Sequence, residues 1–268
     1  MNKYFYIKYI ILVFLLVFII FKNFILTFYF IYKNNIKVGD NIINFVYIYN
    51  EIFYNNDYNL NINLDNCVIF DIGANMGIFS LWINEKFKNT NIYLFEPIHY
   101  LLDIAKYNLT VMKKNNNKFF YNYCGLSNTN KQEIINYYPY ANGLCTIKNF
   151  DDKLQYHTVL EQFFLKIAMN KKEKYKIKLL TLKYYIEKYN IQNIDICKID
   201  VEGFENEVIE GFFDKINIVK IFIIEIENFR LDNFNNIKHC LHNYKIIPKT
   251  PLHNNFIMIY AIRKDLTL

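Results

Sequence analysis

The segment Phe70-Asp71-Ile72-Gly73-Ala74-Asn75-Met76-Gly77 contains the residue types with which a nucleotide-type cofactor site begins. An apolar run that starts at Cys67 ends in an acid and in a turn bounded by two glycines. Glycine lets the backbone turn tightly and approach a ligand closely, with free N–H groups directed at it. The spacing differs from the dinucleotide fingerprint G-x-G-x-x-G, and an ordinary strand-to-helix turn also favours glycine and asparagine. We therefore expect a cofactor contact, with a plain turn as the alternative, at Asp71, Gly73, Ala74, Asn75 and Gly77.

A second acid follows the next apolar run of the chain. Residues Asn91 to Phe95 lead into Glu96-Pro97, where Pro97 stops the strand and leaves Glu96 at its rim. A carboxylate in that place can accept hydrogen bonds from both hydroxyls of a ribose. The alternative is a glutamate that caps a helix or faces solvent. We predict that Glu96 holds the ribose of the cofactor.

Polar residues alternate at the end of a third run, from Asp195 to Glu205. If the strand stays extended, Lys198, Asp200 and Glu202 share one face, at the strand end that borders the ligand crevice of an open α/β sheet. A substrate hydroxyl that acts as a nucleophile must lose a proton near the transition state. Asp200 or Glu202 could take or orient that proton while Lys198 biases their charge, so all three are candidate catalytic residues. A structural ion-paired network is the alternative.

Together these motifs resemble the FkbM-type methyltransferase family, and Lys198 to Glu205 is the most specific of them. The resemblance covers roughly Glu51 to Asp265. It implies a class I S-adenosylmethionine-dependent methyltransferase that acts on hydroxyl groups of sugars, glycolipids or polyketides, with Gly125, Leu126 and Ser127 on the adenine side of the cofactor. His99, where the family commonly has proline, and an insertion from Phe150 to Met169 depart from the pattern, which puts the acceptor in doubt more than the cofactor.

Alternating strands and helices predict a doubly wound, mostly parallel seven-stranded sheet of the Rossmann-like class I methyltransferase type. Beyond the three strands above, we expect strands at Phe119–Cys124, Val219–Glu225, Tyr244–Ile247 and Phe256–Ile262. A helix from Gln155 to Met169 is expected either to cover the acceptor pocket or simply to pack. The predicted division is a membrane anchor at residues 1–32, a linker and N-terminal cap at residues 33–66, and a methyltransferase domain at residues 67–268.

The amino-terminal segment has the composition of a transmembrane helix. Ile10 to Phe21 is an unbroken apolar run, apolar character resumes from Phe24 to Tyr32, and tyrosines flank both sides. Residues 1–38 contain no Ala, Gly or Ser, so a signal-peptidase site is missing and an uncleaved single-pass anchor is expected. Lysines on both flanks leave the orientation open. A cleaved or merely buried helix is the alternative.

Charge and cysteine usage narrow the function further. Residues 1–38 hold five of the 31 basic residues and none of the 25 acidic ones, so the rest of the chain is near neutral and a nucleic-acid substrate is not expected. The five cysteines and five histidines lack metal-ligand or disulfide spacing, and no metal is expected. The expected activity is O-methylation of a small-molecule or glycan acceptor. The alternative is a membrane-tethered domain that binds the cofactor or a partner without turnover.

Overall fold

The computed structural model describes residues 22–55, 58, 62–147, 166–167, 169–227, 231–249 and 256–266. Most of the predicted anchor, residues 1–21, lies outside these ranges, as does nearly all of the helix predicted at Gln155 to Met169. None of the helices in the described ranges combines the length and the apolar character that crossing a bilayer requires.

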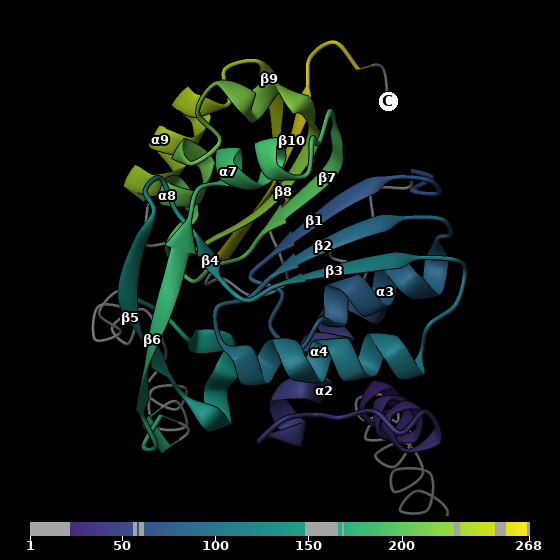
Figure 1. Cartoon of the computed structure of the whole chain (residues 1–268). Coiled ribbons are helices and arrows are strands. Elements are labelled where there is room, and N and C mark those ends of the chain that lie inside the picture. Colours follow the sequence, from purple (N-terminus) through teal and green to yellow (C-terminus); the bar gives the residue numbers. More distant parts are fainter. Residues whose placement is uncertain are drawn as a thin grey trace, which may run out of the picture.

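A seven-stranded sheet forms the centre of the molecule, with the strand order β3-β2-β1-β7-β8-β10-β9 (Figure 1). Strand β10 is antiparallel to both of its neighbours, and the other neighbouring strands run parallel. This order confirms the predicted doubly wound, mostly parallel sheet of the class I methyltransferase type. The strands are β1 (Val68–Ile72), β2 (Asn91–Phe95), β3 (Lys118–Asn122), β7 (Ile194–Ile199), β8 (Val219–Glu227), β9 (Tyr244–Lys249) and β10 (Phe256–Arg263).

Helices cover both faces of this sheet, which explains why its central strands read as nearly continuous apolar runs. Helices α3 (Ile78–Lys86) and α4 (His99–Val111), with α2 (Ile42–Phe53) beyond them, lie on one face. Helices α7 (Leu182–Lys188), α8 (Glu205–Glu210) and α9 (Leu231–Cys240) lie on the other. Alternate residues of a strand serve the two layers: Ile196 packs with α3, and Cys197 packs with α7 and α8. The described residues also include two short 3-10 helices, η1 (Pro139–Leu144) and η2 (Phe213–Ile218).

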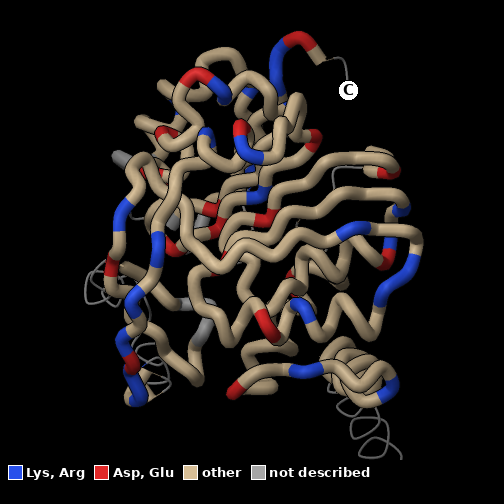
Figure 2. Tube along the Cα trace, viewed as in Figure 1, with Lys and Arg blue, Asp and Glu red and all other residues tan. Residues whose placement is uncertain are grey.

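A second, three-stranded sheet was not expected from the sequence. It contains β4 (Gly125–Leu126), β5 (Lys131–Tyr137) and β6 (Glu173–Leu180) in the order β4-β6-β5. The basic residues Lys171 and Lys172 precede β6, and Glu173 and Lys174 are its first two residues. Lysines recur along β6, at Lys174, Lys176 and Lys178 (Figure 2), because one face of this small sheet is exposed. The alternation of these lysines with Ile177 and Leu179 is the pattern of a half-buried strand.

Residues 22–33 form a helix that packs on α2. The ring centroids of Phe30 and Tyr49 lie 4.8 Å apart, and those of Phe30 and Phe53 lie 6.3 Å apart. The amide of Asn50 donates a hydrogen bond to the Thr27 hydroxyl at 3.3 Å. The predicted boundary at residue 32 therefore separates two helices that contact each other.

Candidate active site

Three neighbouring parallel strands, β2, β1 and β7, end at the same level of the sheet, and β8 passes through that level before it ends at Glu227. The residues at that level form one row. Ile72 of β1 pairs with Phe95 of β2 and with Ile199 of β7, and Ile199 pairs with Ile224 of β8. One residue further along each strand, the row reads Glu96, Gly73, Asp200 and Glu225. Adjacent positions in such a row are about 4.8 Å apart. Three acids are thus spaced across the carboxyl edge of the sheet.

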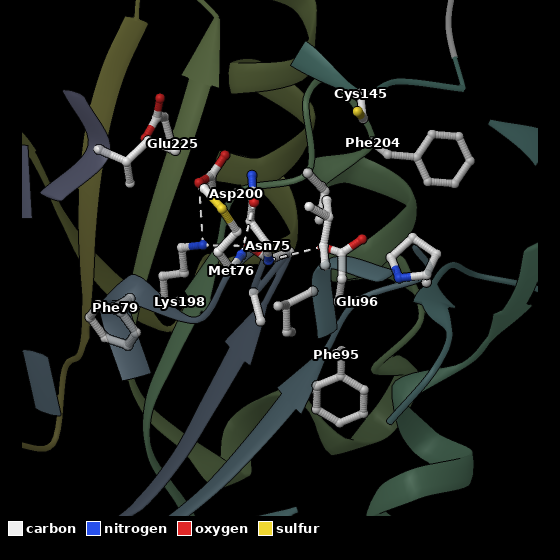
Figure 3. A pocket seen from close by; sticks show the side chains of 18 of the residues that line it. Asn75, Met76, Phe79, Phe95, Glu96, Cys145, Lys198, Asp200, Phe204 and Glu225 are labelled. Atoms are coloured by element: carbon white, nitrogen blue, oxygen red, sulfur yellow. Dashed lines mark hydrogen bonds and ion pairs between the residues drawn. The ribbon is translucent and has the colours of Figure 1, made fainter. Parts of the chain in front are cut away.

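A cavity of about 220 Å³ lies along this row. Its floor is formed by the strand ends and by the turn after β1, and residues from α2, α3 and the small sheet form its walls. Figure 3 shows Glu225, Asp200, Asn75 and Glu96 in sequence across the pocket, with Lys198 beside Asp200. The position matches the ligand crevice of open α/β sheets, outside the carboxyl ends of the strands.

The N–H groups of the turn after β1 are not free, contrary to the sequence-based expectation. The N–H groups of Gly73 and Ala74 both donate to the Phe95 carbonyl at 3.0 Å, and that of Asn75 donates to Glu96 Oε2 at 2.9 Å. The remaining two bonds lie within the turn: Met76 N donates to Asn75 Oδ1 and Gly77 N donates to the Ala74 carbonyl, both at 2.8 Å. The amides of the turn therefore stabilise the turn itself. A ligand can contact the carbonyl groups, the side chains and the exposed backbone of the turn.

The two glycines of this turn are required by packing. Gly73 has φ +73°, and a Cβ there would lie 1.8 Å from the carbonyl oxygen of Asp200. Gly77 has φ +75°, caps α3, and a Cβ there would lie 2.7 Å from Cβ of Ala105 in α4. Side chains at these positions would push apart the segments that form the pocket floor, so the glycines bring β1 close to the end of β7.

Glu96 is only 6% exposed, and its two oxygens are held by backbone amides. Oε2 accepts from Asn75 N and Oε1 accepts from Ile98 N, both at 2.9 Å. Burial raises the pKa of Glu96 to about 7, although the two amide hydrogen bonds act in the opposite direction. Each oxygen keeps a lone pair for a further donor. The arrangement fits the predicted contact with two ribose hydroxyls.

Lys198 is buried between two acids and fastens the turn to the end of β7. Its Nζ lies 3.4 Å from Asp71 Oδ1 and 3.2 Å from Asp200 Oδ2, and it donates to the Gly73 carbonyl at 2.9 Å. Burial lowers the pKa of Lys198, but Asp200 and Asp71 raise it further, so the net pKa lies above its usual range. Lys198 therefore stays charged at neutral pH and is not suited to accept a proton.

Asp71 does not line the cavity. It is fully buried, and the Ser80 hydroxyl of α3 donates to its Oδ2 at 2.6 Å. The side chain lies beneath the turn, on the same face as Lys198, and its carboxylate pairs with the Lys198 ammonium group. The predicted contact between Asp71 and the methionine end of the cofactor is therefore not direct in this structure.

The predicted shared face of Lys198, Asp200 and Glu202 holds only for the first two residues. Strand β7 ends at Ile199, and Glu202 has φ +54°, so the chain turns before the alternation can continue. The Glu202 carbonyl accepts a hydrogen bond from the Thr146 hydroxyl at 2.9 Å. Asp200 lines the cavity and Glu202 does not. The prediction assumed an extended strand, and the left-handed turn at Glu202 and Gly203 invalidates that assumption.

The segment predicted on the adenine side is divided. Gly125 and Leu126 line the cavity as part of β4, opposite Phe95 and Pro97. Ser127 is fully buried, its N–H donates to the Leu180 carbonyl at 2.9 Å, and its own carbonyl packs against Gly211. Ser127 thus joins the small sheet to α8 and does not reach the pocket.

Two residues at the far end of the row were not predicted as site residues. Glu225 of β8 lines the cavity, and the hydroxyl of Tyr58, also a lining residue, donates to Glu225 Oε2 at 3.3 Å. The signal was present in the sequence, since Glu225 is an acid within the apolar run Val219 to Ile226. A charged side chain in such a run is seldom buried without a partner or a function.

The residues present fit the cofactor that the sequence motifs imply. Glu96 has free lone pairs for ribose hydroxyls, and the apolar surfaces of Phe95, Pro97 and Leu126 can flank a planar base. Asp200 provides negative charge toward the centre of the row, where a sulfonium and an amino group need it. The ribose, the adenine and the cationic groups of S-adenosylmethionine would each meet a complementary surface in this cavity.

The chain is similar in sequence to known methyltransferases. The family described as the methyltransferase FkbM domain matches residues 71–258. The chain is 32% identical over 101 residues to methyltransferase sdnD of Sordaria araneosa, which covers 38% of this chain and 39% of that protein. It is 25% identical over 170 residues to methyltransferase 1 of Beauveria bassiana, covering 63% and 68%. The crystal structure of methyltransferase FkbM from Methylobacillus flagellatus aligns with a TM-score of 0.49 and 14% identity, covering 80% of this chain and 47% of that one.

The family match extends over most of the methyltransferase domain predicted from the sequence, and it includes all four positions of the row at the sheet edge. The cofactor of this family is S-adenosylmethionine. The chain belongs to the FkbM methyltransferase family.

Proposed function

We propose that this chain transfers a methyl group from S-adenosylmethionine to a hydroxyl oxygen of a sugar, a glycolipid or a similar small molecule. The observation that carries the proposal is the row Glu96, Gly73, Asp200 and Glu225 along one cavity. Glu96 at one end suits the ribose. With spacings of about 4.8 Å, Asp200 lies about 10 Å from it, which leaves a separate place for an acceptor beyond the methyl donor.

The residues of the chain would orient the reactants and receive one proton. Bound S-adenosylmethionine supplies an electrophilic methyl group. Glu96 holds the ribose, and Asp200, kept in an ion pair with Lys198, faces the cavity where it can accept the proton of the acceptor hydroxyl. The apolar walls from α3 and the small sheet restrict water. Orientation of this kind can supply about 7 to 11 kcal/mol of a barrier.

Two measurements on the full chain test the proposal. Calorimetry with S-adenosylhomocysteine should show binding, and cell extracts incubated with cofactor carrying a deuterated methyl group should yield a labelled glycan, lipid or small molecule by mass spectrometry. No binding by a folded sample would refute both the enzyme and a cofactor-binding role. Binding without any labelled product would instead favour the non-catalytic, cofactor-binding alternative.

We also propose that the amino-terminal segment attaches the protein to a membrane. The apolar run Ile10 to Phe21 supports this, and so do the aromatic side chains exposed on the helix of residues 22–33, where Tyr29 is 59% and Tyr32 is 87% exposed. Fractionation of cells that produce the full chain, or a chain without residues 1–21, tests it. Equal membrane association of both forms would reject the proposal.

A further inference from the structure

Glu225 occupies the end of the row furthest from the ribose position. Because Asp200 and Glu225 follow the paired residues Ile199 and Ile224 on neighbouring parallel strands, their Cα atoms are about 4.8 Å apart. Both residues line the cavity, and Figure 3 shows Glu225 on the far side of Asp200 from Glu96. Two carboxyl groups in this relation can contact adjacent atoms of a single bound molecule.

The hydrogen bonding of Glu225 defines which of its oxygens is available. Oε2 accepts from the Tyr58 hydroxyl at 3.3 Å. Within the described part of the chain no donor is bonded to Oε1. Tyr58 is itself buried, and burial, followed by the charge of Glu225, raises its pKa well above the usual value, so it remains a donor to Oε2. A proton on Glu225 would therefore sit on Oε1.

The surroundings of Glu225 favour that proton. Burial raises its pKa well above the usual range, and the neighbouring carboxylates of Asp200, Glu202 and Glu51 raise it further. Lys198 opposes them, but its two ion pairs are with Asp71 and Asp200. One neutral acid beside one carboxylate is the pattern in which two neighbouring acids take different roles. Here Glu225 has a proton to donate and Asp200 can accept one.

We propose that Glu225 is an acceptor-binding residue that selects a vicinal diol, with its carboxylic acid donating a hydrogen bond to the oxygen next to the one that is methylated. This inference rests on the proposed O-methylation. Asp200 accepts the proton of the reacting hydroxyl, and Glu225, whose Cα lies about 4.8 Å from that of Asp200, contacts the oxygen on the neighbouring carbon. The surrounding acids disfavour an anionic acceptor. Neutral sugars and polyols therefore fit the pocket better than phosphorylated or carboxylated ones.

The protonation state is tested first, without any acceptor. Infrared difference spectra between the full-length protein and Glu225→Gln, both bound to S-adenosylhomocysteine at pH 7, should show loss of a protonated carboxyl band. Loss of a carboxylate band instead would overturn the donor role. Because this measurement needs no turnover, it decides the state of Glu225 whether or not methyl transfer is found.

Transfer of a deuterated methyl group tests the selectivity. The acceptor is the compound from cell extracts that becomes labelled. Glu225→Leu should raise the KM for this acceptor at least tenfold and leave the affinity for S-adenosylhomocysteine unchanged. Glu225→Gln keeps an N–H donor of similar size, so its KM for the acceptor should stay closer to that of the unaltered protein. The labelled methyl should lie on one oxygen of a vicinal pair. A product with no neighbouring oxygen, or equal KM values for the leucine variant and the unaltered protein, would refute the inference. Absence of any product would refute the proposed O-methylation instead.

Discussion

Replacement of Lys198 by methionine should destabilise the fold severely. The side chain is 5% exposed and its partner Asp71 is fully buried, so the substitution leaves a carboxylate inside the protein without its cation. It also removes the donor to the Gly73 carbonyl. Methionine has a similar length and fills the same space, which separates the loss of charge from the loss of volume.

The expected loss follows from the burial of the pair. Removing one partner of a buried ion pair costs about 3 to 5 kcal/mol. At about 2 to 4 °C per kcal/mol for a domain of this size, the melting temperature should fall by about 6 to 20 °C. The double variant Lys198→Met, Asp71→Asn should recover more than half of that loss, because an amide needs no counter-charge in the interior.

Denaturant titration followed by circular dichroism measures the differences in the free energy of unfolding, and thermal unfolding followed by the same signal measures the differences in melting temperature. A matched control is Lys183→Met, because Lys183 lies 2.9 Å from Asp214 but both side chains are well exposed, and such surface pairs contribute little. The control should leave the denaturation midpoint within error. If Lys198→Met is no more harmful than the control, or if the double variant is worse than the single one, Lys198 does not act as the cation of a buried pair.

Three further predictions concern the cofactor, the base and the anchor. Since burial raises the pKa of Glu96 to about 7 and ribose hydroxyls donate to its ionised form, affinity for S-adenosylhomocysteine should fall about tenfold from pH 8 to pH 6, and Glu96→Gln should remove this slope in calorimetry. Between about pH 4.5 and 7 the folded state holds more protons on Glu96 than the unfolded state, so this group makes the protein less stable as pH rises through that range. Asp200→Asn should lower turnover in a methyl-transfer assay by about 10²- to 10⁴-fold, whereas Glu202→Gln should keep most of the turnover. If Glu202→Gln is instead the more harmful substitution, Glu202 and not Asp200 is the general base. Deletion of residues 1–21 should preserve the affinity for S-adenosylhomocysteine. Deletion through residue 32 also removes most of the helix that packs on α2 and should weaken that affinity. Equal affinities of the two shortened proteins would show that this helix does not support the pocket.

The parts of the fold that follow from local pattern were predictable. The break at Glu96-Pro97 placed the end of β2 correctly, because a parallel strand buried on both faces is mostly apolar. The break at Asp71 placed the end of β1 one residue early, since Asp71 is itself a strand residue and β1 ends at Ile72. Helix α7 begins after Thr181, whose hydroxyl accepts from Tyr184 N, as threonine commonly does at the start of a helix. Each of these features depends on residues close in the sequence.

Features that depend on the pairing of distant segments were not predictable in the same way. The use of the amides of the turn after β1 depends on the Phe95 carbonyl and on Glu96, more than twenty residues away. The significance of Glu225 appears only when β8 is placed next to β7 in register with Asp200. An isolated acid in an apolar strand indicates that a partner or a proton must compensate for its burial. The sequence alone does not identify that partner.

The construction of the cavity separates the two halves of the proposed reaction. The cofactor side comes mostly from one continuous stretch, residues 72–97, whose turn, strand end and buried carboxylate hold each other by short hydrogen bonds. The acceptor side comes from α2, residue 58, residues 145–147, and strands β5, β6 and β8, which are far apart in the sequence. A substitution in one of these separate segments can change the shape of the acceptor side without breaking the network around Glu96. Acceptor specificity should therefore vary among members of the family through α2 and the small sheet, while the cofactor frame stays the same.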